Sequence, residues 1–239
     1  MSSRRSDRPL DGRGSSSLGC KWIKPEKFVL LVEPVVGAID SVAGHGGSAA
    51  SRLFPIVRRS TARAALRAAT HDIHERMHHH PALSRLAAGT IKRDEYRRLL
   101  ARSYGFYAMV EPLLGLAGNS TKRLRHDLTT FGLTPAAIDD LPRCAPVAVD
   151  QDLAGLIGAR YVVLGASLGG KVMARAMSGR TDGDASLPVR FLMGADENEW
   201  KIFATDLEKS LPDAGSRTCA ATAAAAVFAA YEEWMTWRE

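Results

Sequence analysis

The sequence is poor in cysteine and has no long uninterrupted hydrophobic run. Its three cysteines, Cys20, Cys144 and Cys219, are odd in number and widely spaced. This excludes the disulfide framework of a small secreted domain and the paired thiols of a zinc ribbon. The run 28–36 is interrupted by a glutamate, and the alanine-rich stretch 220–230 is shorter than the roughly 20 residues that span a bilayer. We therefore expect no signal peptide, no membrane anchor and a reducing, cytoplasmic location.

The chain also lacks a basic folded region, although its formal net charge is +6. Residues 1–60 carry 10 Lys and Arg against 5 Asp and Glu, whereas residues 61–239 carry 22 against 21. A nucleic-acid-binding domain would carry its positive charge on the folded part, so nucleic acid is not an expected partner. Residues 1–59, rich in serine and glycine, are predicted to be a disordered N-terminal extension of one domain over residues 60–239. A misplaced translation start would explain the same composition.

Apolar residues recur at helical spacing from residue 61 onward, and β-branched runs of period two are scarce. We therefore predict an all-α domain. The polar piece 121–131 is not assigned to a helix. The expected helices are one ending before Pro81, one from the N-cap Thr90 to Pro112, a short one from Thr134-Pro135 to Leu141, a long apolar one within 151–178, and two at 196–210 and 217–237.

The most informative stretch is 161–172, Tyr-Val-Val-Leu-Gly-Ala-Ser-Leu-Gly-Gly-Lys-Val. Gly165-Ala-Ser167-Leu-Gly169 is the G-x-S-x-G pattern of a serine hydrolase, in which Ser167 would be the nucleophile. The histidine base of that fold follows the serine, whereas all seven histidines here precede it. The segment from Gly165 to Lys171 also matches the phosphate-binding G-x-x-x-x-G-K, but a valine stands where a hydroxyl must hold magnesium. Both patterns are therefore incomplete.

The same stretch can also be a helix with bare backbone. Inside a helix, glycine lowers stability by roughly 1 kcal/mol relative to alanine. Gly165, Gly169 and Gly170 therefore need a favourable interaction that offsets this loss. One compensation is close packing of another helix across Gly165-x-x-x-Gly169. The other is a flat ligand that lies directly on the backbone, with a partner element on its opposite side. The residues leave both open.

The first helix offers such a partner. Its buried stripe runs through Leu66, Ile73 and Met77, and His74 lies at the edge of this stripe. Arg67 shares the face of His74, about 10 Å away along the helix axis. This separation suits an iron ligand and a cation at the propionate edge of a porphyrin, although a histidine at such an edge is more often a packing residue.

The same helix contains parts of two other metal-binding patterns. Glu75-x-x-His78 is half of the diiron carboxylate signature, and the sequence contains no second half. His74 and His78 are four residues apart and could chelate zinc. We interpret the run from His78 to His80 instead as a solvated helix end.

Three segments together indicate a known family. In chain order they are Leu66-Arg67-Ala-Ala-Thr70-x-x-x-His74, Gly165-x-x-x-Gly169-Gly170 and Trp200-x-x-Phe203-x-x-x-Leu207. Over about residues 60–239 the chain resembles the haem (heme) oxygenase family, and it is most similar to the bacterial, biliverdin-producing branch that supplies bacteriophytochromes. The resemblance implies a single-domain, all-α bundle with haem between a proximal helix and a distal, glycine-rich helix.

The resemblance also implies roles for single residues. The axial iron ligand of the family falls on His74. Its propionate-binding cations fall on Arg67 and Lys201. Its distal glycines fall on Gly165, Gly169 and Gly170. Ala166 stands where animal relatives hold the distal water network with an aspartate, so we expect Ser167 to be a donor in that network. His78 stands where some relatives carry a carboxylate near the axial imidazole.

The implied reaction uses haem as both substrate and prosthetic group. It cleaves haem with O2 and reducing equivalents to biliverdin, carbon monoxide and Fe2+. The implied electron donor is a ferredoxin, a flavodoxin or an NAD(P)H-dependent reductase, and a bacteriophytochrome is the implied acceptor of biliverdin. Two other functions stay open, namely a non-degrading haem carrier or sensor that uses His74, and a serine hydrolase that uses Ser167.

Overall fold

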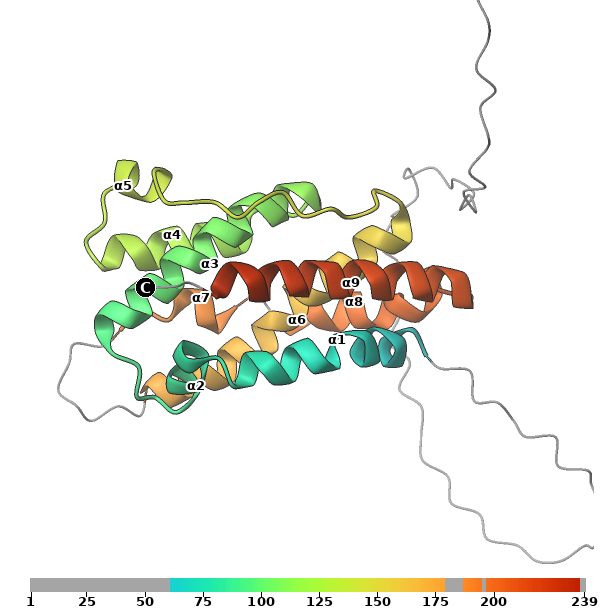
Figure 1. Cartoon of the computed structure of the whole chain (residues 1–239), viewed down its shortest axis with the longest axis horizontal. Coiled ribbons are helices and arrows are strands. Elements are labelled where there is room, and N and C mark those ends of the chain that lie inside the picture. The colour runs from blue at the N-terminus through green and yellow to red at the C-terminus, as the bar shows by residue number, and fades with distance from the viewer. Residues whose placement is uncertain (1–60, 179–186, 195–196, 237–239) are drawn as a thin grey trace, which may run out of the picture. The chain divides into compact units, whose positions relative to one another are not determined.

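The computed structural model describes residues 61–178, 187–194 and 197–236. The described part of the chain holds no β-strand, which confirms the all-α prediction (Figure 1). The predicted N-terminal extension, residues 1–59, lies outside the described residues. The helices of the described part are α1 (Ala62–His78), α2 (Pro81–Ala87), α3 (Arg93–Leu113), α4 (Asn119–Thr130), α5 (Pro135–Asp139), α6 (Leu153–Ser178), α7 (Arg190–Met193), α8 (Glu197–Ser210) and α9 (Ala214–Met235).

One predicted helix start is wrong. Lys92, not Thr90, is the N-cap residue of α3, and the Thr90 hydroxyl instead donates a hydrogen bond to the carbonyl of Arg85 at the end of α2. The start predicted at Thr134 is confirmed, because its side chain accepts a hydrogen bond from the amide of Ala137. The sequence did not reveal that Pro81 begins a further helix, α2. Because α2 ends just before Thr90, the Thr90 hydroxyl bonds to that helix and does not cap α3.

Helices α2, α4 and α7 were not predicted. Helix α4 covers the polar piece near residue 121 and buries Leu124, Asp127 and Leu128. The Asp127 carboxylate accepts hydrogen bonds from the amides of Arg190 and Phe191, at 3.2 and 2.8 Å, and so caps the start of α7. Burial raises the pKa of this carboxyl, and the two amides oppose that shift. A polar helix is therefore held in the domain by a buried carboxylate that links α4 to α7.

Helix α6 runs without a break through the glycine stretch. A nucleophile elbow and a phosphate loop both require a strand, a turn and then a helix. Neither arrangement is present around Gly165 or Ser167, so the hydrolase and phosphate-loop interpretations are wrong. In the described part of the chain, α6 is also the one helix whose length and composition would allow it to cross a membrane. It packs against α9, α7, α2 and α8.

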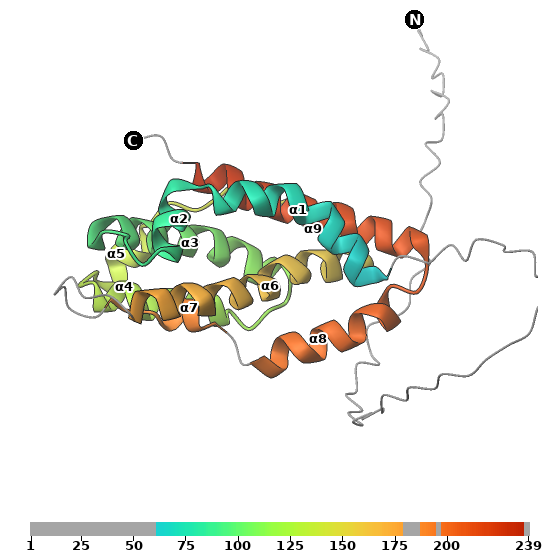
Figure 2. The ribbon, with the colours of Figure 1, turned by 90° about the horizontal axis from the view of Figure 1, so that it is seen from below.

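Helix α9 is the common support of the helices that matter for the site. Both α1 and α6 pack against it, and Figure 2 shows α9 beside α1. The contact with α6 is very close at Gly158, because a Cβ atom placed there would lie 1.9 Å from the carbonyl oxygen of Ala220. Small residues on both helices therefore set the distance between α6 and α9.

Polar contacts hold both ends of α1. At its start, the Glu208 carboxylate of α8 accepts hydrogen bonds from the amides of Ala62 and Arg63, at 2.9 and 3.1 Å. Near its end, Arg76 donates two hydrogen bonds to Glu232 of α9, at 2.7 and 2.8 Å. The face of α1 that carries His74 is thereby held in one orientation relative to α9.

Replacing Gly158 by alanine tests the contact between α6 and α9. We expect Gly158→Ala to lower the free energy of unfolding by about 1–3 kcal/mol, because the added methyl group overlaps the α9 backbone. Gly169→Ala is the matched control in the same helix, since a Cβ atom there meets nothing within 4 Å. This control should be neutral or stabilising by up to about 1 kcal/mol. Urea unfolding of the ligand-free protein distinguishes the two, and equal effects would contradict the assigned packing.

Candidate functional site

A cavity of about 780 Å³ lies between α1 and α6. Its volume is within the roughly 300–1,000 Å³ of typical small-molecule sites. Aromatic and aliphatic side chains from α3 and α9 close its inner side. They include Leu99, Leu100, Phe106, Tyr107, Phe228 and Tyr231.

His74 projects from α1 into this cavity. Its side chain is 58% exposed, and its ring lies 6.3 Å from that of Phe228 and 4.4 Å from that of His78. Partial burial lowers the pKa of His74, and the charge of His78 adds to this effect. A lowered pKa favours the neutral imidazole, which is the form that binds a metal.

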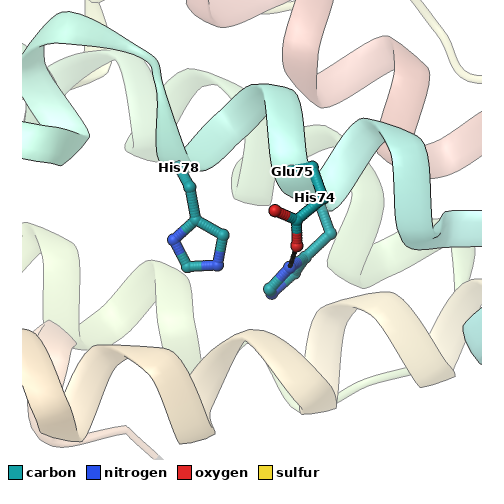
Figure 3. A group of neighbouring side chains, drawn as sticks. All are labelled: His74, Glu75 and His78. Carbon is teal, nitrogen blue, oxygen red and sulfur yellow. Dashed lines mark ion pairs between the residues drawn. The ribbon is translucent and has the colours of Figure 1, made fainter.

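His78 and Glu75 accompany His74 on the same side of α1, as Figure 3 shows. The Glu75 carboxylate lies 3.8 Å from Nδ1 of His74. Residues 74–78 read His-Glu-Arg-Met-His. This is the complete H-E-x-x-H pattern of helical zinc sites, and it supports the zinc alternative over a merely solvated helix end. One metal-ligand atom of each of the three residues lies within 4.8 Å of the other two.

The opposite wall of the cavity is the bare backbone of α6. A Cβ atom on Gly169 would meet nothing within 4 Å, and one on Gly165 would meet only the ring of Trp200, at 3.5 Å. Close helix packing across these two glycines is therefore not the reason for them. Both residues line the cavity and leave backbone exposed to it.

Gly170 has a different structural reason. A Cβ atom there would lie 2.5 Å from the carbonyl oxygen of Leu192, so the missing side chain lets α7 approach α6. Gly170 also lines the cavity, so it stays a predicted site residue as well as a packing contact. The tight packing that the glycine pattern suggested thus occurs at Gly170 and at Gly158.

Ser167 lines the cavity, but its hydroxyl donates a hydrogen bond to the carbonyl of Leu164 at 2.7 Å. A serine hydroxyl has one proton to donate. In this arrangement Ser167 can accept a hydrogen bond from water, while its proton is used within α6. Ala166 next to it offers no polar group.

Cations gather at one end of the cavity. Arg63 and Arg67 of α1 line it, and both lie near Tyr161 of α6. Burial raises the pKa of Tyr161, and these two guanidinium groups oppose the shift. Lys201 is exposed on α8 and does not line the cavity, so the structure does not bring it to Arg67. On α1, Arg63 lines the cavity together with Arg67.

The sequence contained a signal for Arg63 but none for Arg123. Arg63 lies four residues before Arg67, so helical periodicity places both on the face of His74. Arg123 of α4 also lines the cavity, and its Nε is buried without a hydrogen-bond partner in the described part of the chain. Only the packing of α4 brings this residue to the site.

Comparison with known proteins agrees with this architecture. The crystal structure of heme oxygenase-1 from the cyanobacterium Synechocystis, in complex with heme, matches with a TM-score of 0.54 at 18% sequence identity. The match covers 73% of this chain and 90% of that chain. No curated protein matches the chain in sequence. The fold is therefore that of a helical haem oxygenase.

A protein-family model described as Heme oxygenase matches residues 60–236 of the chain. The chain belongs to the haem oxygenase family. Haem is accordingly the ligand of this family, and haem degradation is its activity. The cavity residues fit that ligand, because a neutral imidazole and side-chain-free backbone line facing walls and guanidinium groups lie at one end.

The two arginines can be tested against the lysine that lies outside the cavity. We expect Arg67→Met to weaken haemin binding about two- to fivefold, as expected for an exposed charge pair, and Arg63→Met/Arg67→Met to weaken it further. Lys201→Met, the control for losing one positive charge, should leave the affinity unchanged. Soret titrations at low and high salt measure all three. An equal loss in Lys201→Met would show that the cation assignment is wrong.

A second variant tests Ser167. We expect Ser167→Ala to change haemin affinity and haem turnover by less than about twofold, because only a hydrogen bond within the helix is lost. The Soret titration, the turnover rate and the isomer of the product are the measurements. A changed product isomer would instead make Ser167 a functional donor.

Proposed function

We propose that the protein is a soluble, cytoplasmic haem oxygenase that converts haem to biliverdin, carbon monoxide and Fe2+. Residues 60–239 form its catalytic domain in this proposal. One observation carries it, namely that His74 and the glycines Gly165 and Gly169 line facing walls of one cavity. The family match over residues 60–236 supports the same assignment.

Haem, when bound, supplies the iron that activates O2 and the macrocycle that is opened. His74 would hold the iron from α1 through its imidazole, a ligand that does not drive O–O cleavage as a thiolate would. Gly165 and Gly169 would let the ligand approach the α6 backbone closely, because neither has a side chain. Arg63 and Arg67 would bind the propionates and so orient the ring in the cavity.

The reaction consumes electrons, so the proposal includes an external donor. We propose a ferredoxin, a flavodoxin or an NAD(P)H-dependent reductase for this role. A bacteriophytochrome is the proposed acceptor of biliverdin. The family membership supports the need for a donor, and purified donors of the three classes can be compared by the rate at which they support haem loss.

Haemin binding and turnover test the function directly. We expect one equivalent of haemin to produce a Soret band, and ascorbate with O2 to convert this band into the spectrum of biliverdin. His74→Ala should shift the Soret band and abolish the conversion, because the iron loses its imidazole ligand. Circular dichroism of the variant checks that the helices are retained.

The outcomes separate the alternatives. A Soret band that is stable under ascorbate and O2 would favour the haem carrier or sensor that uses the same His74. A wild-type protein without any Soret band would overturn every proposal in which haem is the ligand. Release of carbon monoxide, measured with a haem-protein trap, distinguishes ring opening from simple bleaching.

A further inference from the structure

The strongest unassigned group of side chains is the His-Glu-x-x-His segment of α1. Haem requires only one imidazole from this segment. His78 lies one helical turn beyond His74, and its ring meets that of His74 edge to face, with the ring centroids 4.4 Å apart. Figure 3 shows both rings on the same side of the helix, with the Glu75 carboxylate beside His74.

The distances allow one ion to bind all three residues. Zinc binds histidine nitrogen and carboxylate oxygen at about 2.0–2.2 Å, so two ligand atoms on one tetrahedral ion lie about 3.4 Å apart. The ligand atoms of His74, Glu75 and His78 already lie within 4.8 Å of one another. All three side chains are exposed, so rotation about their χ angles can shorten these distances without moving the helix.

The residue types and the neighbouring side chains favour a metal as well. In the H-E-x-x-H helices of metalloenzymes the two histidines bind zinc and the glutamate acts as a general base. Here the Glu75 carboxylate lies close enough to both imidazoles to be a third ligand. His71 lies one turn before His74 and also lines the cavity. Glu75 balances part of the charge of a divalent ion, and the open side of the cavity leaves room for water as a further ligand.

We propose that the haem-free protein binds one divalent transition-metal ion through His74, Glu75 and His78, and that this ion and haemin exclude each other. They compete because both require His74. The site accepts the ion class of ferrous iron, which the proposed function releases next to His74. His78 and Glu75 would then be available as ligands for an iron ion released beside His74. The competition with haemin and the binding of released iron rest on the proposed function, whereas the metal site itself does not.

The test uses the full-length, haem-free protein without a polyhistidine tag. Zn2+ affinity is measured by competition with a chromophoric chelator, and Co2+ absorption reports the coordination geometry. We expect one Zn2+ per chain. His78→Ala should weaken Zn2+ binding by about tenfold or more, since even outer-shell changes at metal sites cost about 10–100-fold. His79→Ala is the matched control, because His79 is exposed beside the site and does not line the cavity.

Competition with haemin forms the second arm. Zn2+ should slow the appearance of the Soret band in the wild-type protein and in His79→Ala, but not in His78→Ala, which keeps the haem ligand His74. Unchanged Zn2+ affinity in His78→Ala, or an equal loss in His79→Ala, would overturn the metal site. A wild-type protein that binds Zn2+ but no haemin would overturn the proposed function and leave the metal site standing.

Discussion

The close contact between α6 and α9 is the constraint on which the site depends. Gly158 brings the α6 backbone against Ala220, and α9 in turn carries α1. The width of the cavity is thus set by backbone-to-backbone packing on a shared support. Glu208 and the Arg76–Glu232 pair then fix α1 at its two ends. The cavity between α1 and α6 depends on this rigid support, because the imidazole and the bare backbone that line it make few contacts that would keep the two helices apart.

The glycines of α6 serve two purposes that their spacing does not separate. Gly158 and Gly170 are needed because neighbouring backbone lies where a Cβ atom would be, whereas Gly169 faces open space. At Gly158 and Gly170 the missing side chain therefore allows close packing of neighbouring helices. At Gly169 it leaves the helix backbone exposed to the cavity. The metal-binding potential of α1 is similarly independent of the haem fit, since His74 belongs to both ligand sets.

Helical periodicity predicted the all-α fold, the long apolar helix and the positions of His74 and Arg67 on one face of α1. It also would have placed Arg63 there and revealed the H-E-x-x-H pattern, because both are properties of a single helix. It failed at Thr90, whose hydroxyl bonds to the preceding helix, and at Lys201, whose exposure depends on how α8 packs. Helix α4 was missed because its few apolar positions become meaningful only when α7 is docked on Asp127.

The sequence by itself determined the class of fold, the family and the chemistry of the first helix, since these depend on the order and spacing of residues along single helices. The tertiary structure alone decided which glycines face the cavity, that Arg63 rather than Lys201 lines it with Arg67, and that Arg123 lies at its wall. These features depend on contacts between helices far apart in the chain. No local pattern encodes such a contact, because its geometry is set by how the helices pack on one another, with α1, α3 and α6 on α9.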